Sequence, residues 1–117
     1  MKTVLIIEND PDTLDVLETV VQELSVKTIS KTSTIPLTEL ASINPDLILL
    51  DHWLDGHYGA DFCKTLKADE HFAGIPVIII SFVATLKSVA QESGADDCIS
   101  KPFDVEELQK TVAKYLN

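Results

Sequence analysis

Polar side chains suited to phosphoryl transfer stand directly after four short strand-like runs of this sequence. In chain order, Glu8 follows TVLII, Asp51 follows LILL, Ser81 follows VIII and Lys101 follows DCIS. A carboxylate can act as a nucleophile and form an acyl phosphate. An ammonium group holds a phosphoryl oxygen as a point charge, a hydroxyl donates a hydrogen bond, and neighbouring carboxylates hold a divalent cation. The set therefore predicts phosphoryl transfer to Asp51.

Each of these residues also has a simpler structural interpretation. Asp51 could be a loop acid, and Glu8 and Asp10 could merely favour the N-terminus of a helix. Ser81 could be a turn hydroxyl, and Lys101 a solvated lysine before a proline. The chemical interpretation is favoured because all of them follow strand-like runs.

The apolar runs predict the strands of a parallel sheet. Residues 3–7, 47–50 and 77–80 are continuously aliphatic rather than alternating, which is typical of strands buried on both faces. Residues 26–30 and 97–100 are more polar and suit the edges of the sheet.

Helical patterns separate these runs. One helix is expected to begin near Pro11, with Asp10 or Asp12 as its cap. The others are expected at residues 35–43, at 60–68, at 84–93 before Gly94, and after Asp104. Five strands that alternate with five helices predict a doubly wound α/β domain.

In such a fold, ligands bind outside the carboxyl ends of the strands. We therefore expect Asp51 at the rim of the core, presented to solvent and not buried.

Composition sets further bounds. A length of 117 residues and 45% hydrophobic residues suit one domain, residues 1–117, with one core. The net charge is −10 and all nine basic residues are lysines, which makes nucleic acid an improbable partner. No apolar run approaches the roughly 20 residues that cross a bilayer, and no signal peptide is evident. We expect a cytoplasmic protein without membrane contact, with Cys63 and Cys98 as a reduced, buried pair.

Four motifs identify a family resemblance over essentially the full length. They are VLIIENDPDT, PDLILLDHWLDGHYG, IPVIIIS and GADDCISKPFD. The chain resembles the receiver domain of bacterial response regulators, which act in two-component signalling and phosphorelays. The resemblance implies a flavodoxin-like sheet of order 2-1-3-4-5, and it implies that Asp51 accepts phosphate from a histidine kinase or phosphotransfer protein. Ser81 and Lys101 would take the family's hydroxyl and lysine roles, and the Lys101–Pro102 bond is typically cis.

The resemblance also implies a magnesium site, formed by the residues after the first strand, by Asp51 and by the backbone carbonyl of Trp53. Where receivers usually carry two acids, this chain has Glu8 and Asn9. An amide oxygen can bind Mg²⁺ but carries no formal charge, so we expect weaker Mg²⁺ binding. Asp10 or Asp55 could compensate.

Two positions in the family's switch region depart from its pattern. Phe82 stands where a small alanine is usual, and its ring could narrow access to Asp51. Cys98 stands where an aromatic switch residue is usual, so the usual rotation of that aromatic cannot operate. The segment between Ser81 and Gly94 also looks shorter than is typical.

Several functions remain open from the residues. The first is a phosphorylatable receiver that signals to a downstream protein partner, or shuttles phosphate, by a surface change. Dimerisation, which occurs in the family, is left open. The second is a pseudo-receiver that binds partners without phosphorylation, an alternative motivated by Asn9, Phe82 and Cys98.

Two further functions are disfavoured, and we expect no enzyme. An aspartyl phosphatase needs a second acid two residues after the nucleophile, where this chain has Trp53. A zinc site would have to use residues whose spacing fits no known pattern: His52, His57, Cys63 and Cys98. Both histidines are expected to be exposed loop residues.

Overall fold

A five-stranded parallel sheet forms the centre of the computed structural model, which describes residues 1–54 and 56–116. Its strands are β1 (Thr3–Ile7), β2 (Lys27–Lys31), β3 (Leu47–Asp51), β6 (Val77–Ser81) and β7 (Asp97–Ser100). Their order in the sheet is β2-β1-β3-β6-β7. Since β6 and β7 are the fourth and fifth strands of this sheet, the predicted order 2-1-3-4-5 is confirmed.

The continuously aliphatic strands occupy the middle of the sheet. Every residue of β3 and β6 is buried, as are the last four residues of β1, whereas the edge strands β2 and β7 are only partly buried. Burial on both faces explains why these strands carry no polar alternation. The more polar runs lie at the edges, as predicted.

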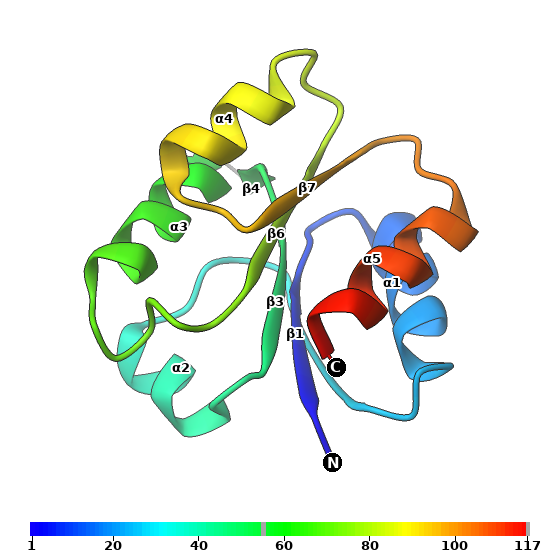
Figure 1. Ribbon diagram of the computed structural model, residues 1–117, viewed down its shortest axis with the longest axis horizontal. Coiled ribbons are helices and arrows are strands. Elements are labelled where there is room, and N and C mark those ends of the chain that lie inside the picture. The colour runs from blue at the N-terminus through cyan, green and yellow to red at the C-terminus, as the bar shows by residue number, and fades with distance from the viewer. Residues whose placement is uncertain (55, 117) are drawn as a thin grey trace.

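Helices cover both faces of the sheet (Figure 1). They are α1 (Pro11–Gln22), α2 (Leu37–Ile43), α3 (Gly59–Ala68), α4 (Leu86–Ser93) and α5 (Val105–Leu116). One face packs on α1 and α5, through a cluster that includes Leu17 and Leu108. The other packs on α2, α3 and α4, through a cluster that includes Leu40 and Leu66. The domain is therefore doubly wound, as the sequence predicted.

Local signals explain several helix ends. The Asp10 carboxylate accepts a hydrogen bond from the Thr13 N–H and caps α1, and Gly94 ends α4 in the left-handed region at φ 79°. The predicted helices at 35–43 and 84–93 each begin two residues later than expected. For α2 the reason is Pro36, which takes the N-cap position and favours an extended residue before it.

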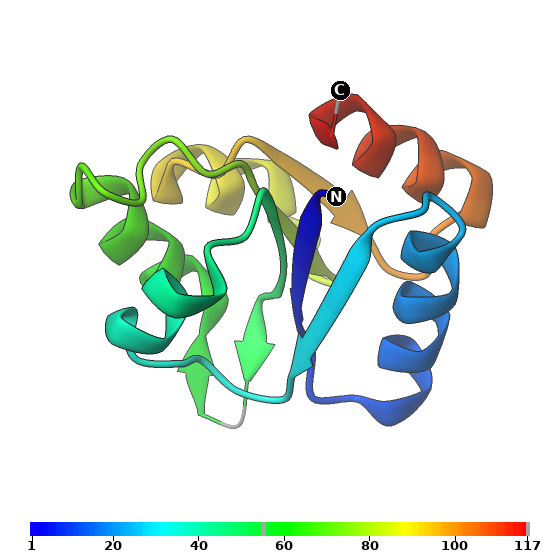
Figure 2. The same cartoon turned by 90° about the horizontal axis from the view of Figure 1, so that it is seen from below.

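A two-stranded hairpin lies between β3 and α3 and was not predicted. It pairs β4 (Trp53–Leu54) with β5 (His57–Tyr58) in antiparallel fashion. Figure 2 shows it at the same end of the sheet as the loop from β1 to α1, which is the end that carries the carboxyl termini of the strands.

Three further observations bear on the sequence predictions. The Lys101–Pro102 bond is cis, as the family resemblance implied. Cys63 is buried and free, but the free Cys98 is only partly buried, so the predicted buried pair is wrong for Cys98. Among the described residues, no helix is both long and apolar enough to span a bilayer.

Candidate functional site

The carboxyl ends of four neighbouring strands bring Glu8, Asp51, Ser81 and Lys101 to one edge of the sheet. Ile7 pairs with Leu50, and Asp51 pairs with Ile80. The next residues along β1 and β3, Glu8 and Asp51, therefore lie at the same level of the sheet on adjacent strands. The Lys101 N–H donates to the Ser81 carbonyl over 2.9 Å, which fixes the lysine beside the end of β6. Residues separated by up to 93 positions thus meet at this edge.

The Lys101 ammonium lies between two carboxylates. Its Nζ donates to Glu8 Oε1 over 2.7 Å and to Asp51 Oδ1 over 3.4 Å. The side chain of Lys101 is 6% exposed and that of Glu8 is 1% exposed. Lys101 is therefore held mainly by Glu8, inside an almost closed site.

Asp51 itself is buried, with 8% of its surface exposed. The expectation that Asp51 is presented to solvent is therefore wrong. A buried carboxylate needs a positive partner or hydrogen-bond donors. Lys101, which lies 50 positions later in the chain, supplies the positive charge.

The pKa of Glu8 is raised above its ordinary value. Burial is the main cause, and a hydrogen bond with the Asp51 carboxyl, in which one protonated acid donates to the other, adds to it. Lys101 acts in the opposite direction and lowers the pKa. Two carboxyl groups thus compete for one ammonium group, which makes the ionised form of Glu8 less favourable than in water.

The variant Glu8→Gln tests the raised pKa of Glu8 through the pH dependence of the free energy of unfolding. Because the folded pKa of Glu8 lies above its ordinary value of 4.5, its contribution to stability is complete below that pH and is lost as the pH rises through the folded pKa. Glutamine does not titrate, so the free energy of unfolding of Glu8→Gln, minus that of the wild type, should rise over this window. Urea unfolding in a chelator at several pH values measures it. Parallel curves for both proteins would contradict the account, and the exposed Glu92→Gln serves as the control.

The two residues after Glu8 have different places. The Asp10 carboxylate accepts from the Thr13 N–H over 2.9 Å and from its hydroxyl over 2.6 Å, and these bonds lower the pKa of Asp10. Its backbone N–H donates to Glu8 Oε2 over 3.2 Å. Asn9 is half-buried between them. Asp10 is thus engaged as the cap of α1, whereas Glu8 reaches into the site.

Oxygen ligands for a hard cation are present at this edge. Glu8 and Asp51 provide two carboxyl groups whose mutual contact raises the pKa of Glu8, and a cation would relieve this repulsion. No group of three or more His, Cys, Asp or Glu side chains in the described ranges could hold a metal ion. The remaining ligands would therefore be of other kinds, such as the Asn9 amide oxygen and the backbone carbonyl of Trp53. Asp55 lies outside the described residues.

The residues predicted for the switch region, Phe82 and Cys98, have different surroundings. The Ser81 hydroxyl is buried and accepts a hydrogen bond from the Val83 N–H over 3.2 Å. Between them, Phe82 is 72% exposed, and its ring centroid lies 5.5 Å from Lys101 Nζ. Cys98 packs against the cluster under α2 to α4, and burial raises the pKa of its thiol. Phe82 thus contacts the site, whereas Cys98 lies partly buried at the margin of the core.

The β4–β5 hairpin follows the site directly and arranges aromatic residues beside it. His52 is 8% exposed and stacks on the Tyr58 ring at 5.2 Å, so the prediction that it is an exposed loop residue is wrong. His57 is exposed, as predicted. The Trp53 ring meets the edge of the Tyr58 ring at 5.0 Å and stays half exposed. Two-residue strands have no periodicity, but the glycine at 56 was a usable turn signal.

Gly59 joins the hairpin to α3 in very close contact with Asp51. Its N–H donates to the His52 carbonyl over 2.6 Å. A Cβ at this position would collide with the backbone carbonyl of Asp51. Glycine is therefore required because the chain passes directly over the backbone of the nucleophile candidate.

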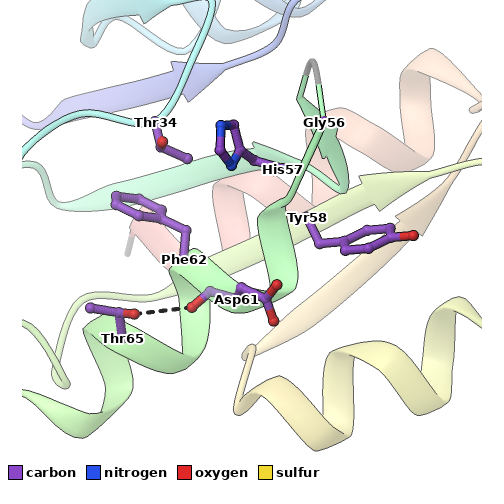
Figure 3. Close-up of a pocket in the computed structure, with 7 residues that line it drawn as sticks. All are labelled: Thr34, Gly56, His57, Tyr58, Asp61, Phe62 and Thr65. Atoms are coloured by element: carbon purple, nitrogen blue, oxygen red, sulfur yellow. Dashed lines mark hydrogen bonds between the residues drawn. The ribbon is translucent and has the colours of Figure 1, made fainter.

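Two pockets adjoin the hairpin without reaching this set. Figure 3 shows one of about 260 Å³, in which the His57 and Phe62 rings lie near Thr34 while the Tyr58 ring points away. The second, about 210 Å³, lies beside His52 between α3 and α4. Neither is lined by a member of the Glu8, Asp51, Ser81 and Lys101 set.

A family model described as the response regulator receiver domain matches residues 4–113. Among curated relatives, the DNA-binding dual master transcriptional regulator RpaA of Synechocystis is 34% identical over 99% of this chain and 49% of its own length. The heme response regulator HssR of Staphylococcus epidermidis is 36% identical over 89% of this chain and 46% of its own length. The chain thus spans about half the length of these relatives.

Solved structures are similar over the whole chain. The signal receiver domain of a DNA-binding response regulator from Colwellia psychrerythraea matches with a TM-score of 0.89 and 26% identity, over 99% of this chain and 98% of that one. The signal receiver domain of a histidine kinase from Syntrophus aciditrophicus matches with a TM-score of 0.87 and 27% identity, over 99% and 90%.

Proposed function

Because this chain belongs to the family of response regulator receiver domains, we propose that it accepts a phosphoryl group on Asp51 from a histidine kinase or phosphotransfer protein. The observation that supports this most is the position of Lys101, whose ammonium contacts Asp51 and Glu8 at the strand ends. We further propose that residues 1–117 form one receiver domain.

The transfer follows from the side chains at this edge. An Asp51 oxygen attacks phosphorus, the new O–P bond forms an acyl phosphate, and the bond from phosphorus to the donor nitrogen breaks as the histidine leaves. Lys101, now 2.7 Å from Glu8, would turn its charge to a phosphoryl oxygen. The Ser81 hydroxyl, which accepts a hydrogen bond from the Val83 N–H, would donate its own hydrogen to another oxygen.

We propose Mg²⁺ as the cofactor, since it would neutralise the charge of the incoming phosphoryl group and of the carboxylates. Glu8, Asn9, Asp51 and the Trp53 carbonyl would hold it. Both capping hydrogen bonds of Asp10 are accepted by Oδ2, so its Oδ1 could serve as a further ligand while the side chain still caps α1.

Family membership describes a signalling module rather than an enzyme with its own substrate. We propose that it works in the cytoplasm and passes its state to a downstream protein through a change of surface. The relatives whose names include DNA binding are proteins about twice as long as this chain. For residues 1–117, with a net charge of −10, we propose a protein partner and no nucleic acid.

Phosphate uptake tests this proposal. The chain is incubated with a small phosphodonor such as acetyl phosphate, with Mg²⁺ or with a chelator, and its intact mass is measured. We expect the mass of one added phosphoryl group with Mg²⁺ and much less in the chelator. No added mass under either condition would contradict the proposal.

A pseudo-receiver that binds partners without phosphate is the second candidate. The observation that favours it is that Lys101 is held by Glu8 inside a nearly closed site. Fluorescence of Trp53, the single tryptophan, separates the two in a Mg²⁺ titration, because its carbonyl is a proposed ligand and its ring is half exposed. A saturable change that is lost in Asp51→Asn supports the phosphoacceptor. A flat titration to high millimolar Mg²⁺ supports the pseudo-receiver.

A further inference from the structure

An apolar groove lies beside the site on the face covered by α1 and α5. It encloses about 340 Å³, and its lining combines Val16 of α1 and Val105 of α5 with Phe82, Lys101 and Phe103. Lys101, whose ammonium contacts Asp51 and Glu8, is among the residues that line this groove. The two pockets beside the hairpin do not include Lys101.

Phe82 lies where this groove meets Lys101. It follows Ser81 directly, and its ring lies over Lys101, with 5.5 Å from the ring centroid to Nζ. Lys101 keeps only 6% of its side chain exposed although it borders the groove. With 72% of its own surface exposed, the Phe82 ring contributes little to the core. Val16 and Val105 line the same groove and are also exposed, so Phe82 belongs to an exposed apolar patch, a feature that commonly marks a functional surface.

We infer that Phe82 is a specificity-determining residue that screens Asp51 and Lys101 from small phosphodonors in solution. The ring blocks direct approach along the groove and favours the form in which Lys101 stays against Glu8, since an ammonium is attracted to the face of an aromatic ring. A small anionic donor must then displace or pass the ring before an oxygen of Asp51 can reach phosphorus. The inference rests on the proposed phosphoacceptor function.

The test compares the rate of phosphate uptake on Asp51 between the wild type and Phe82→Ala. Acetyl phosphate and the smaller phosphoramidate are used at concentrations well below saturation, with Mg²⁺, and intact mass is followed over time. Val105→Ala is the matched control, because this half-exposed apolar residue lines the same groove from the first turn of α5. Phe82→Leu retains an apolar side chain without the ring and should lie between the wild type and Phe82→Ala.

We expect Phe82→Ala to take up phosphate several-fold faster than the wild type, with a larger gain for acetyl phosphate than for phosphoramidate. A purely structural role of the ring would not change the ratio between the two donors. Equal rates in the wild type, Phe82→Ala and Val105→Ala would overturn the screening role and leave the phosphoacceptor function intact. No uptake by any of these proteins would overturn both.

Discussion

Asp51→Asn is expected to take up no phosphate from any donor while it stays folded. The variant removes the carboxylate oxygen that attacks phosphorus, and an amide is too weak a nucleophile to replace it. It also removes one of two carboxyl groups that share Lys101, which leaves the 2.7 Å pair with Glu8 in place. Intact mass after incubation with acetyl phosphate and Mg²⁺ measures uptake, and urea unfolding measures stability.

The loss of phosphate uptake in Asp51→Asn can be assigned to the missing nucleophile, because the stability of the variant should not fall. Relief of the contact between the two carboxyl groups should leave the free energy of unfolding of Asp51→Asn equal to that of the wild type or above it. Asp15→Asn, an exposed position on α1, makes the same substitution away from the strand ends and should retain full uptake. Uptake by Asp51→Asn at the wild-type rate would place the phosphoryl group on another residue.

Gly59→Ala is expected to destabilise the protein and to displace Asp51. The added Cβ would collide with the backbone carbonyl of Asp51, and a backbone atom of a buried strand cannot move without cost. Strain of this kind typically costs about 1–3 kcal/mol, and occasionally more. Since the displaced residue is the nucleophile candidate, phosphate uptake should fall together with stability.

Gly74→Ala provides the matched control for this substitution. Nothing lies within 4 Å of a Cβ at Gly74. The residue lies in the loop that leads into the amino end of β6, whereas the site lies at the carboxyl ends of the strands. Its effect on the free energy of unfolding should stay within about 0.5 kcal/mol. The explanation fails if urea unfolding shows equal effects for the two alanine variants, or if Gly59→Ala takes up phosphate as the wild type does.

The sheet and its order could be predicted because the strands carry a strong signal. Aliphatic runs buried on both faces identify β1, β3 and β6, and the polar residue that ends or follows each run then marks one edge of the sheet. Short elements carry no comparable signal. The hairpin of β4 and β5 has only two residues in each strand, too few for any period to appear.

Burial at the site could not be predicted from local sequence. Whether Asp51 is exposed depends on Lys101 and Glu8, which arrive from distant parts of the chain, and His52 is covered by Tyr58 across the hairpin. Nor could the sequence decide which of the two acids, Glu8 or Asp10, reaches into the site. The difference arises because the Asp10 side chain is used by the first turn of α1, whereas the Glu8 carboxyl accepts from Lys101.

The location of the acyl phosphate tests the central claim most directly. Borohydride reduces an acyl phosphate to an alcohol, so a phosphorylated aspartate becomes homoserine, which peptide mass spectrometry can place in the chain. After incubation with acetyl phosphate and Mg²⁺, we predict homoserine at position 51 and at no other aspartate. Homoserine at Asp10, Asp12 or Asp55 with none at position 51, or a reduced Glu8, would contradict the account.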